Sequence, residues 1–199
     1  MEKNKVKFGL SKVYYSKITF GADGSRIFGA PKPLPGAVNL SLEPQGESVK
    51  WHADNILYYA SATNAGYQGD LEMARITDEF RRDIYGDVKD SETGIQYENA
   101  AAEPAHFALL FQFEGDVHAT RHIMYDCVAA RPAVASSTTT ETKEPVTSSI
   151  QITAAPREDG IVKASTTDDT PVATYNDWYK AVNEPPAAIL DNATQEPVA

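Results

Sequence analysis

The sequence predicts a mainly β (α+β) fold: an antiparallel β-sandwich or partly closed barrel with a flanking α-helix. Three observations favour this class. Short segments of alternating apolar and polar residues recur along the chain, separated by turn residues at hairpin spacing. Helical periodicity is confined to two short segments. Twelve glycines, twelve prolines and ten tyrosines suit turns and strands better than a helical bundle.

The first thirty residues predict an arm followed by a hairpin. Residues 1–11 are polar and basic, with a small alternating apolar group formed by Val6, Phe8 and Leu10. This N-terminal arm either adds a strand to a neighbouring sheet edge or is an ordinary first strand. Residues 13–20 predict a strong strand, residues 21–24 carry the Asp-Gly hairpin signal, and residues 26–30 return.

The next segment predicts edge structure and a second hairpin. Pro31, Pro33 and Pro35 keep the chain extended but outside any central ladder. The pattern then predicts a half-buried strand over 38–42, a turn over 44–46 and a returning strand over 48–51. Residues 52–66 predict one further strand, at 56–59, and a mobile loop.

A strand that runs directly into a helix is expected over residues 66–87, around which the rest of the fold is organised. Its first half alternates between two faces. The buried face is formed by Gly69, Leu71 and Met73, and the acidic face by Asp70 and Glu72. Thr77 can then cap a helix whose apolar stripe is formed by Ile76, Phe80 and Ile84. Gly86 is expected to end this helix.

The second half of the chain predicts an acidic excursion and a buried hairpin. Residues 87–104 are acidic and nearly free of core residues, so they are expected to form a mobile surface loop. Residues 106–113 and 120–128 predict paired strands around Glu114-Gly115-Asp116. Strict alternation places Cys127 on the apolar face with Ile123 and Tyr125.

The C-terminal part begins with a Ser/Thr-rich stretch, residues 136–149, that buries too little apolar surface to be ordered alone. Strands follow at 151–153 and 161–164, with a turn at 156–160. Thr174 starts a second helix, which ends at residues 184–186. Its largely aromatic face is formed by Tyr175, Trp178, Tyr179 and Val182. Residues 1–183 therefore form one domain, and 184–199 are expected to be a disordered tail.

Composition excludes several classes of function. The formal charge of −10 argues against binding nucleic acid through its phosphates, because that requires clustered Lys and Arg. The single cysteine cannot form an internal disulfide, which fits a reducing compartment. The N-terminus has no apolar core of signal-peptide length, and no later run reaches membrane-spanning length. We therefore expect a protein made in a cytoplasm, without a membrane partner.

Candidate chemistry is weak throughout the chain, so no enzyme, metal site or cofactor is expected. His118 and His122 are four residues apart on an alternating segment, where two imidazoles do not share a metal. Cys127 is expected to be a buried, inert thiol, and Asp168-Asp169 fits no calcium loop. Asp70 and Glu72 could do acid–base work in principle, but a solvated acidic face is the simpler interpretation.

Five stretches, in order and at similar spacing, carry a family likeness: KVKFGLSKVYYSKIT, GAPKPLPGAVNLSLEPQGE, GYQGDLEMARITDEFRRDIYG, FALLFQFEGD with ATRHIMYDCVAARP, and ITAAPREDGIVKA with YNDWYKAV. Together they cover about residues 3–183 and resemble the major tail proteins of long-tailed, non-contractile bacteriophages of Gram-positive hosts. The chain departs from that pattern at 87–103 and in the Ser/Thr stretch, so no contact is carried over there.

The resemblance implies a tail-tube β-sandwich that assembles into hexameric rings. Stacked rings would form the tube through which the phage genome passes, in virions assembled in the host cytoplasm. Tape-measure, distal-tail and tail-terminator proteins would be its partners, and DNA would pass without specific binding. No catalytic residue, metal or cofactor is implied.

Physical arguments identify candidate residues for such a role. Sheet edges can join identical subunits through heterologous contacts. Candidate assembly segments are the arm with Val6, Phe8 and Leu10, the loop at 63–66, and residues 136–149. Asp70 and Glu72 would line the bore and repel DNA phosphates.

Two alternatives remain open at the sequence level. Another phage structural role, such as head–tail joining or capsid decoration, would share the β-rich, acidic character. A carbohydrate-binding module is suggested by strand aromatics, although such aromatics usually belong to a core: Tyr14, Tyr15, Tyr58, Tyr59, Trp51.

Overall fold

The computed structural model describes residues 3–138, 145–186 and 189. They form thirteen strands and two helices: β1 Lys7–Phe20, β2 Arg26–Phe28, β3 Lys32–Pro33, β4 Ala37–Gln45, β5 Ser48–Ala53, β6 Ile56–Ala62, β7 Gly66–Met73, α1 Asp78–Tyr85, β8 Val88–Lys89, β9 Gln96–Tyr97, β10 Phe107–Gly115, β11 Thr120–Ala129, β12 Ser148–Ala154, β13 Lys163–Ser165 and α2 Val172–Asp177. The expected mainly β, antiparallel architecture with a short helix is confirmed.

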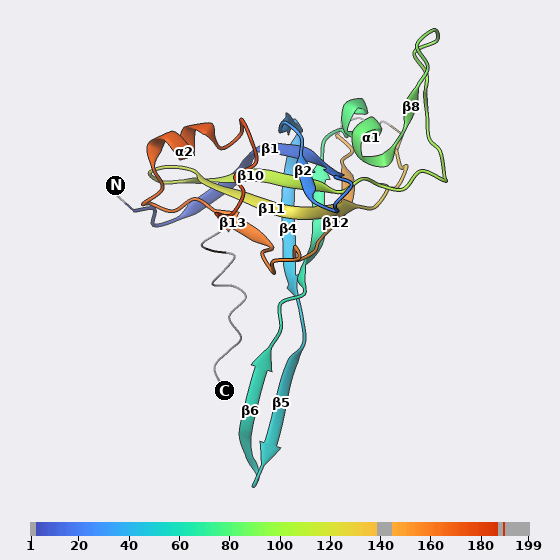
Figure 1. Cartoon of the computed structure of the whole chain (residues 1–199). Coiled ribbons are helices and arrows are strands. Elements are labelled where there is room, and N and C mark those ends of the chain that lie inside the picture. Colours follow the sequence, from blue (N-terminus) through green and yellow to red (C-terminus); the bar gives the residue numbers. More distant parts are fainter. Residues whose placement is uncertain (1–2, 139–144, 187–188, 190–199) are drawn as a thin grey trace.

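The main sheet bends into two layers that cross each other. Its order is β2-β1-β10-β11-β12-β7-β4, with β3 added beside β1 and β13 beside β11. In Figure 1, β1, β10 and β11 run across the view while β4 and β7 run down it. β12 links the layers, because it pairs with β7 along its whole length but with β11 only from Ile152 to Ala154.

The main core fills the space between these layers. It contains inward-facing residues of both, including Leu71, Met73, Ile150 and Leu109. α1 packs over one end of this space, as the helical stripe predicts: Phe80 and Ile84 are fully buried. The Thr77 hydroxyl accepts a hydrogen bond from Phe80 N–H at 3.2 Å, so the expected cap is confirmed.

A smaller core lies on the opposite face of β10 and β11. Ala108, Leu110, Ile123 and Tyr125 meet Trp178 there, beneath α2. The second helix nevertheless differs from the expectation. It begins at Val172 behind Pro171, without a side-chain cap, and ends at Asp177. Pro171 occupies the N-cap position with extended backbone, so the helix opens two residues before the expected start at Thr174.

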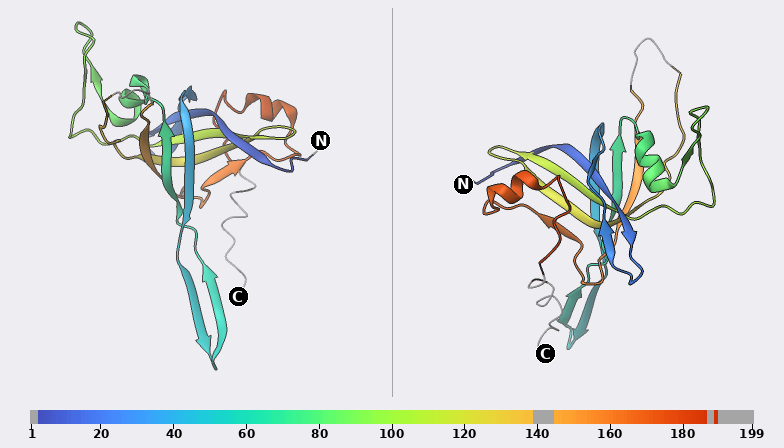
Figure 2. Two further views of the ribbon diagram at one scale, coloured as in Figure 1. Left: turned by 180° about the vertical axis from the view of Figure 1, so that it is seen from behind. Right: turned by 45° about the horizontal axis from the view of Figure 1, so that its top comes forward.

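The turn expected at 44–46 is wrong, and the loop expected at 60–66 is confined to residues 63–65, between β6 and β7. β4 continues through Gln45 into β5, and the chain reverses at Asp54-Asn55, where both residues have positive φ (54° and 61°). β6 returns antiparallel to β5 and continues into β7. Residues 46–65, which we call the ribbon, therefore project from the body as one long hairpin (Figures 1 and 2).

Two further expectations need correction. Cys127 faces the main core with Met124, not with Ile123 and Tyr125, because a register shift between Phe107 and Leu109 changes the alternation. Ser148 and Ser149 already belong to β12, paired with β7.

The expectation for the proline segment is confirmed. Residues 32–33 pair only with β1, off the path of the main sheet, where proline is tolerated.

Some expectations concern segments that the structure describes only in part. Residues 1–2 of the arm, 139–144 of the Ser/Thr stretch, and 187–188 and 190–199 of the tail lie outside the described residues. Residues 87–104 form a surface excursion as expected, which contains the small β8–β9 hairpin. That these segments are mobile before the protein associates with another molecule stays a prediction.

Candidate functional surface

The outer face of β4, β7 and β12 is a continuous polar surface. Asp70 lies opposite Ser41 and Gln151, and Glu72 lies opposite Asn39 and Ser149. Residues opposite each other on antiparallel strands share a face. We call this set the polar face: Asn39, Ser41, Glu43, Gln68, Asp70, Glu72, Ser149, Gln151, Thr153. Three of its members are carboxylates and none is Lys or Arg.

The orientation of the polar face is fixed by the core beneath it. Leu71 and Met73 alternate with the acids and are 1% and 0% exposed. A shift of register by one residue would expose both of them, so Asp70 and Glu72 are held towards solvent. Asp70 accepts a hydrogen bond from the Ser149 hydroxyl at 2.9 Å, and Glu72 accepts one from Thr147. This is a fixed, hydrated negative surface.

The N-terminal candidates belong to the chain's own sheet. β1 begins at Lys7 and pairs with β10, with Leu10 opposite Phe113 and packed on the main core. Asn4 accepts hydrogen bonds from the backbone of the β10–β11 turn. Of the two alternatives for this arm, the structure has the ordinary first strand. Val6 and Phe8 remain exposed, at 51% and 61%.

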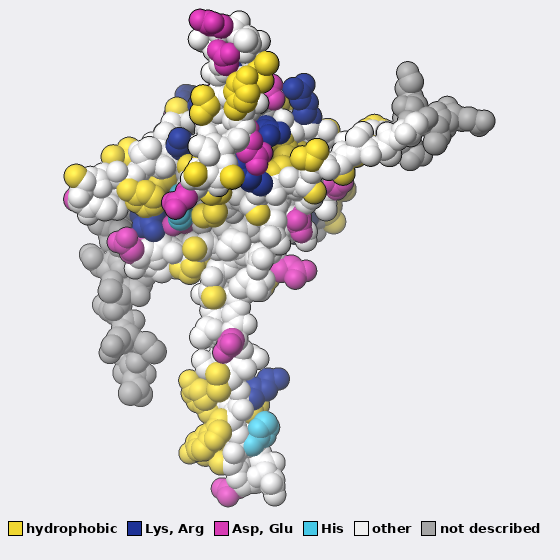
Figure 3. All heavy atoms as spheres, turned by 90° about the vertical axis from the view of Figure 1, so that its right-hand side faces the viewer, with side chains coloured by type: hydrophobic (Ala, Val, Ile, Leu, Met, Phe, Trp, Pro, Cys, Tyr) yellow, Lys and Arg dark blue, Asp and Glu magenta, His cyan; other side chains and the backbone are white. Residues whose placement is uncertain are grey.

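The ribbon carries a second surface that the sequence pattern does not reveal. Its exposed apolar residues are Val49, Trp51, Ile56, Leu57, Tyr58 and Tyr59. Trp51 and Tyr58 pack edge to face, with ring centroids 5.8 Å apart. Figure 3 shows apolar side chains gathered along one side of the ribbon and basic and histidine side chains along the other. The signal for this hairpin was Asp54-Asn55, since both residue types tolerate positive φ.

A groove of about 400 Å³ opens between the two layers. Its lining is mixed. Aliphatic and aromatic side chains stand beside the polar groups of Ser41 and His122, and we define the groove by Leu40, Leu42, Tyr67, Phe111, Phe113 and His122. Lys7 and Lys163 stand at its rim, with their ammonium groups 5.3 Å from the Phe113 ring centroid and 4.5 Å from the Tyr67 ring centroid. The groove therefore combines an aromatic wall with polar groups and is positive at its edge.

His122 contributes an uncharged ring to this groove. Its imidazole stacks on Phe111, with centroids 5.2 Å apart. Burial, and then the nearby charges of Lys163 and Lys7, lower the pKa of His122 from 6.5 to about 4. The ring is consequently neutral at physiological pH and adds no charge to the aromatic wall.

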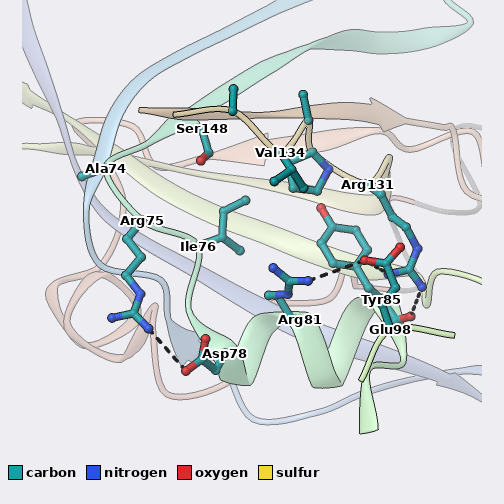
Figure 4. A pocket seen from close by; sticks show the side chains of 13 residues that line it. Ala74, Arg75, Ile76, Asp78, Arg81, Tyr85, Glu98, Arg131, Val134 and Ser148 are labelled. Carbon is teal, nitrogen blue, oxygen red and sulfur yellow. Dashed lines mark hydrogen bonds and ion pairs between the residues drawn. The ribbon is translucent and has the colours of Figure 1, made fainter. Parts of the chain in front are cut away.

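A separate polar pocket lies between α1 and the segment after β11, and its charges are already paired (Figure 4). Arg81 and Arg131 both approach Glu98 there. The same arginines bind the buried carboxylate of Asp87, at 2.9 and 3.1 Å. Although burial opposes ionisation, these hydrogen bonds keep the pKa of Asp87 below its usual value. This network holds the 87–104 excursion to the body.

The other chemical candidates do not come together. His122 lies in the groove wall, whereas His118 pairs with Asp168 at 3.2 Å. The Cys127 thiol is fully buried, and burial raises its pKa. Within residues 3–138, 145–186 and 189, no three His, Cys, Asp or Glu side chains are placed to hold a metal ion. None of the described helices has the length and apolar composition needed to cross a membrane.

Comparison of the chain with protein-family models and with curated proteins finds no match. The described part of the chain presents three distinctive surfaces: the polar face, the ribbon and the groove.

Proposed function

We propose that this protein is a structural subunit that polymerises as stacked hexameric rings into the tail tube of a long, non-contractile-tailed bacteriophage of a Gram-positive host. The tube is the conduit for genome ejection. The subunit acts with tape-measure, distal-tail and tail-terminator proteins, in virions assembled in the host cytoplasm. This proposal rests first on the family resemblance of the sequence.

The structural observation that carries the proposal is the polar face. A tube that conducts DNA requires a wall that is hydrated, negative and free of cations, so that phosphates do not adhere. The polar face combines three carboxylates, including Asp70 and Glu72, with hydroxyl and amide groups only. It is also carried on strands, which suits a continuous lining better than loops do.

The sheet edges provide a route to polymerisation. β4 stands at one end of the main sheet, and β2 and β3 lie beside β1 at the other. An edge strand offers unpaired backbone groups to another chain. Joining unlike edges of identical subunits is a heterologous contact, which closes into a ring when the rotation permits.

Negative-stain imaging of concentrated protein tests the assembly. Rings or long tubes are expected, and a strictly monomeric protein at all concentrations would contradict the proposal. Short, capped particles or binding only to capsids would instead favour the head–tail joining or decoration role.

The double variant Asp70→Lys/Glu72→Lys tests the lining. Tubes should still form, but the variant should retain DNA in a salt-dependent manner and slow its ejection, because four units of charge change on the polar face. Glu92→Lys/Glu103→Lys is the matched control, since both residues are exposed on the 87–104 excursion. If both variants retain DNA equally, or if neither retains it, Asp70 and Glu72 do not line the lumen.

One observation favours a second candidate function. Tyr15 is buried and Tyr14 packs on Tyr179, as expected of core aromatics, but Trp51, Tyr58 and Tyr59 are exposed on the ribbon. Exposed aromatic rings can stack on sugars, so a glycan array separates a carbohydrate-binding module from a self-assembling subunit.

A further inference from the structure

The ribbon presents more apolar surface than an isolated hairpin can keep in water. Trp51 is 59% exposed, Tyr58 69% and Tyr59 55%. No ribbon residue belongs to either core cluster, and the ribbon points away from the body in every view (Figures 1 and 2). A two-stranded hairpin of this kind is marginally stable alone. An exposed apolar patch of this kind marks a site of interaction with another molecule.

The groove has the complementary character. Its lining includes aliphatic and aromatic side chains, and its rim lysines, Lys7 and Lys163, form no ion pair with any carboxylate among the described residues. The ribbon carries Glu47 near its base, Lys50 in β5 and Asp54 at its tip, and these three likewise form no ion pair among the described residues. The exposed rings of the ribbon therefore match the aromatic wall of the groove, and the ribbon's excess of one carboxylate is opposite in sign to the two rim lysines.

We infer that the aromatic side of the ribbon of one copy docks into the groove of a second copy. This inference rests on the proposed self-assembly and identifies the partner surfaces. The three rings are 55–69% exposed, so each has roughly 100–170 Å² left to bury out of the 150–250 Å² of a whole aromatic side chain. Together they supply roughly half of the ~800 Å² per partner that a stable protein interface needs, and the neighbouring apolar residues of the ribbon add to it.

The contact joins unlike surfaces, because a ribbon enters a groove rather than another ribbon. It is heterologous, and repetition of it extends an assembly instead of closing a dimer. Cross-linking distinguishes this contact from two alternatives, in which the ribbon binds a different molecule or a different surface of the second copy.

Cross-linking between two single-cysteine variants tests the inference in the full chain. Val49→Cys places a thiol on the ribbon, and Ser165→Cys places one opposite His122 beside the groove, so that the aromatic rings and rim lysines are retained. Cys127 is fully buried and does not compete for reagent. After assembly of a 1:1 mixture, a short bis-maleimide should yield the Val49→Cys–Ser165→Cys dimer as the main product.

Tyr97→Cys provides the matched control, since Tyr97 is 55% exposed and lies on the other projecting hairpin. Assemblies that cross-link Val49→Cys to Tyr97→Cys, or Val49→Cys to itself, but not to Ser165→Cys, would overturn the inference and leave the proposed function standing. A protein that remains monomeric in sedimentation overturns both.

Two further measurements follow burial of the rings. Trp51→Ala/Tyr58→Ala should raise the concentration needed for assembly by at least tenfold, whereas Tyr97→Ala should not change it. In the wild type, tryptophan emission should shift to shorter wavelength on assembly, because Trp51 becomes covered while Trp178 is already only 4% exposed. An unshifted spectrum of assembled protein counts against the ribbon–groove contact.

Discussion

At the scale of one residue, His122 shows how the aromatic wall of the groove is kept uncharged. Its ring packs against Phe111 and Phe113, with centroids 5.2 and 5.1 Å away, and lies near the ammonium groups of Lys7 and Lys163. Protonation would place a third positive charge in a desolvated site. The environment therefore opposes protonation, and the pKa of His122 falls from 6.5 to about 4.

Acid should weaken the fold through this residue. Because the folded-state pKa lies below the unfolded value, the unfolded chain binds more protons between pH 6.5 and about 4. Stability is thus full above pH 6.5 and declines as the pH falls to 4, by on the order of 1–3 kcal/mol from His122. Urea unfolding across this pH range measures the loss.

The variant His122→Phe isolates that contribution. It should flatten the decline between pH 6.5 and 4, while His52→Phe, which changes an exposed ribbon residue, should leave the decline as it is. Identical pH profiles for wild type and His122→Phe would mean that His122 is not held neutral by its surroundings.

At the scale of one element, β7 is held by a close backbone approach as well as by its buried side chains. Gly69 lies between β4 and β12, opposite Leu42 and Ile152. A Cβ at Gly69 would collide with the carbonyl oxygen of Ser41 in β4. Glycine in a strand commonly marks such a site.

Gly69→Ala should therefore separate β4 from β7 and disturb the polar face. We expect a loss of unfolding free energy of ~1–3 kcal/mol or more, measured by chemical denaturation. Gly9→Ala in β1 is the control, because nothing lies within 4 Å of a Cβ at that position and its effect should be small. Comparable losses for both variants would show that glycine flexibility, rather than the close approach, is responsible.

The elements that sequence could predict are those in which one local pattern decides the outcome. The β7–α1 unit is correct in its strand, cap, stripe and stop, because Leu71, Met73, Thr77 and Gly86 each act locally. The ribbon was missed because Pro44 and Gly46 suggest a turn, whereas pairing of β4 with β7 keeps the chain extended through Gln45. Tertiary pairing outweighs local turn propensity there.

The candidate surfaces were predictable to unequal extents. Period-two alternation predicted that Asp70 and Glu72 share an exposed face, but only the register shows that β4 and β12 extend it. The groove joins residues of β4, β7, β10 and β11 that are far apart in sequence. The face of Cys127 depends on a bulge, which alternation cannot reveal.

At the scale of the whole molecule, the body and the ribbon are energetically separable. Both cores are built from residues outside 46–65, and the ribbon's base is closed by backbone bonding of Thr63 N–H to the Glu47 carbonyl at 3.0 Å. The body therefore owes its stability to the two crossed layers, α1 and α2, and the ribbon is available for contacts with other molecules.

Replacing residues 48–62 with Asn-Gly tests this separation, because that pair favours the tight hairpin turn needed at the shortened base. The body should keep its cooperative unfolding transition and its Trp178 fluorescence, while assembly is lost at concentrations at which the wild type polymerises. Calorimetry and sedimentation measure the two properties. A body that no longer folds, or one that still polymerises, would contradict this division.

The one-sided projection of the ribbon gives any linear assembly a polarity. If every copy points its ribbon the same way, one terminus of the filament displays free ribbons and the other displays empty grooves. The two termini then differ chemically, so incoming copies can add to them at different rates. A protein that starts growth and a protein that stops it would therefore bind opposite ends of the filament. One of them would need a groove that accepts the free ribbons, and the other would need a ribbon that fits the empty grooves.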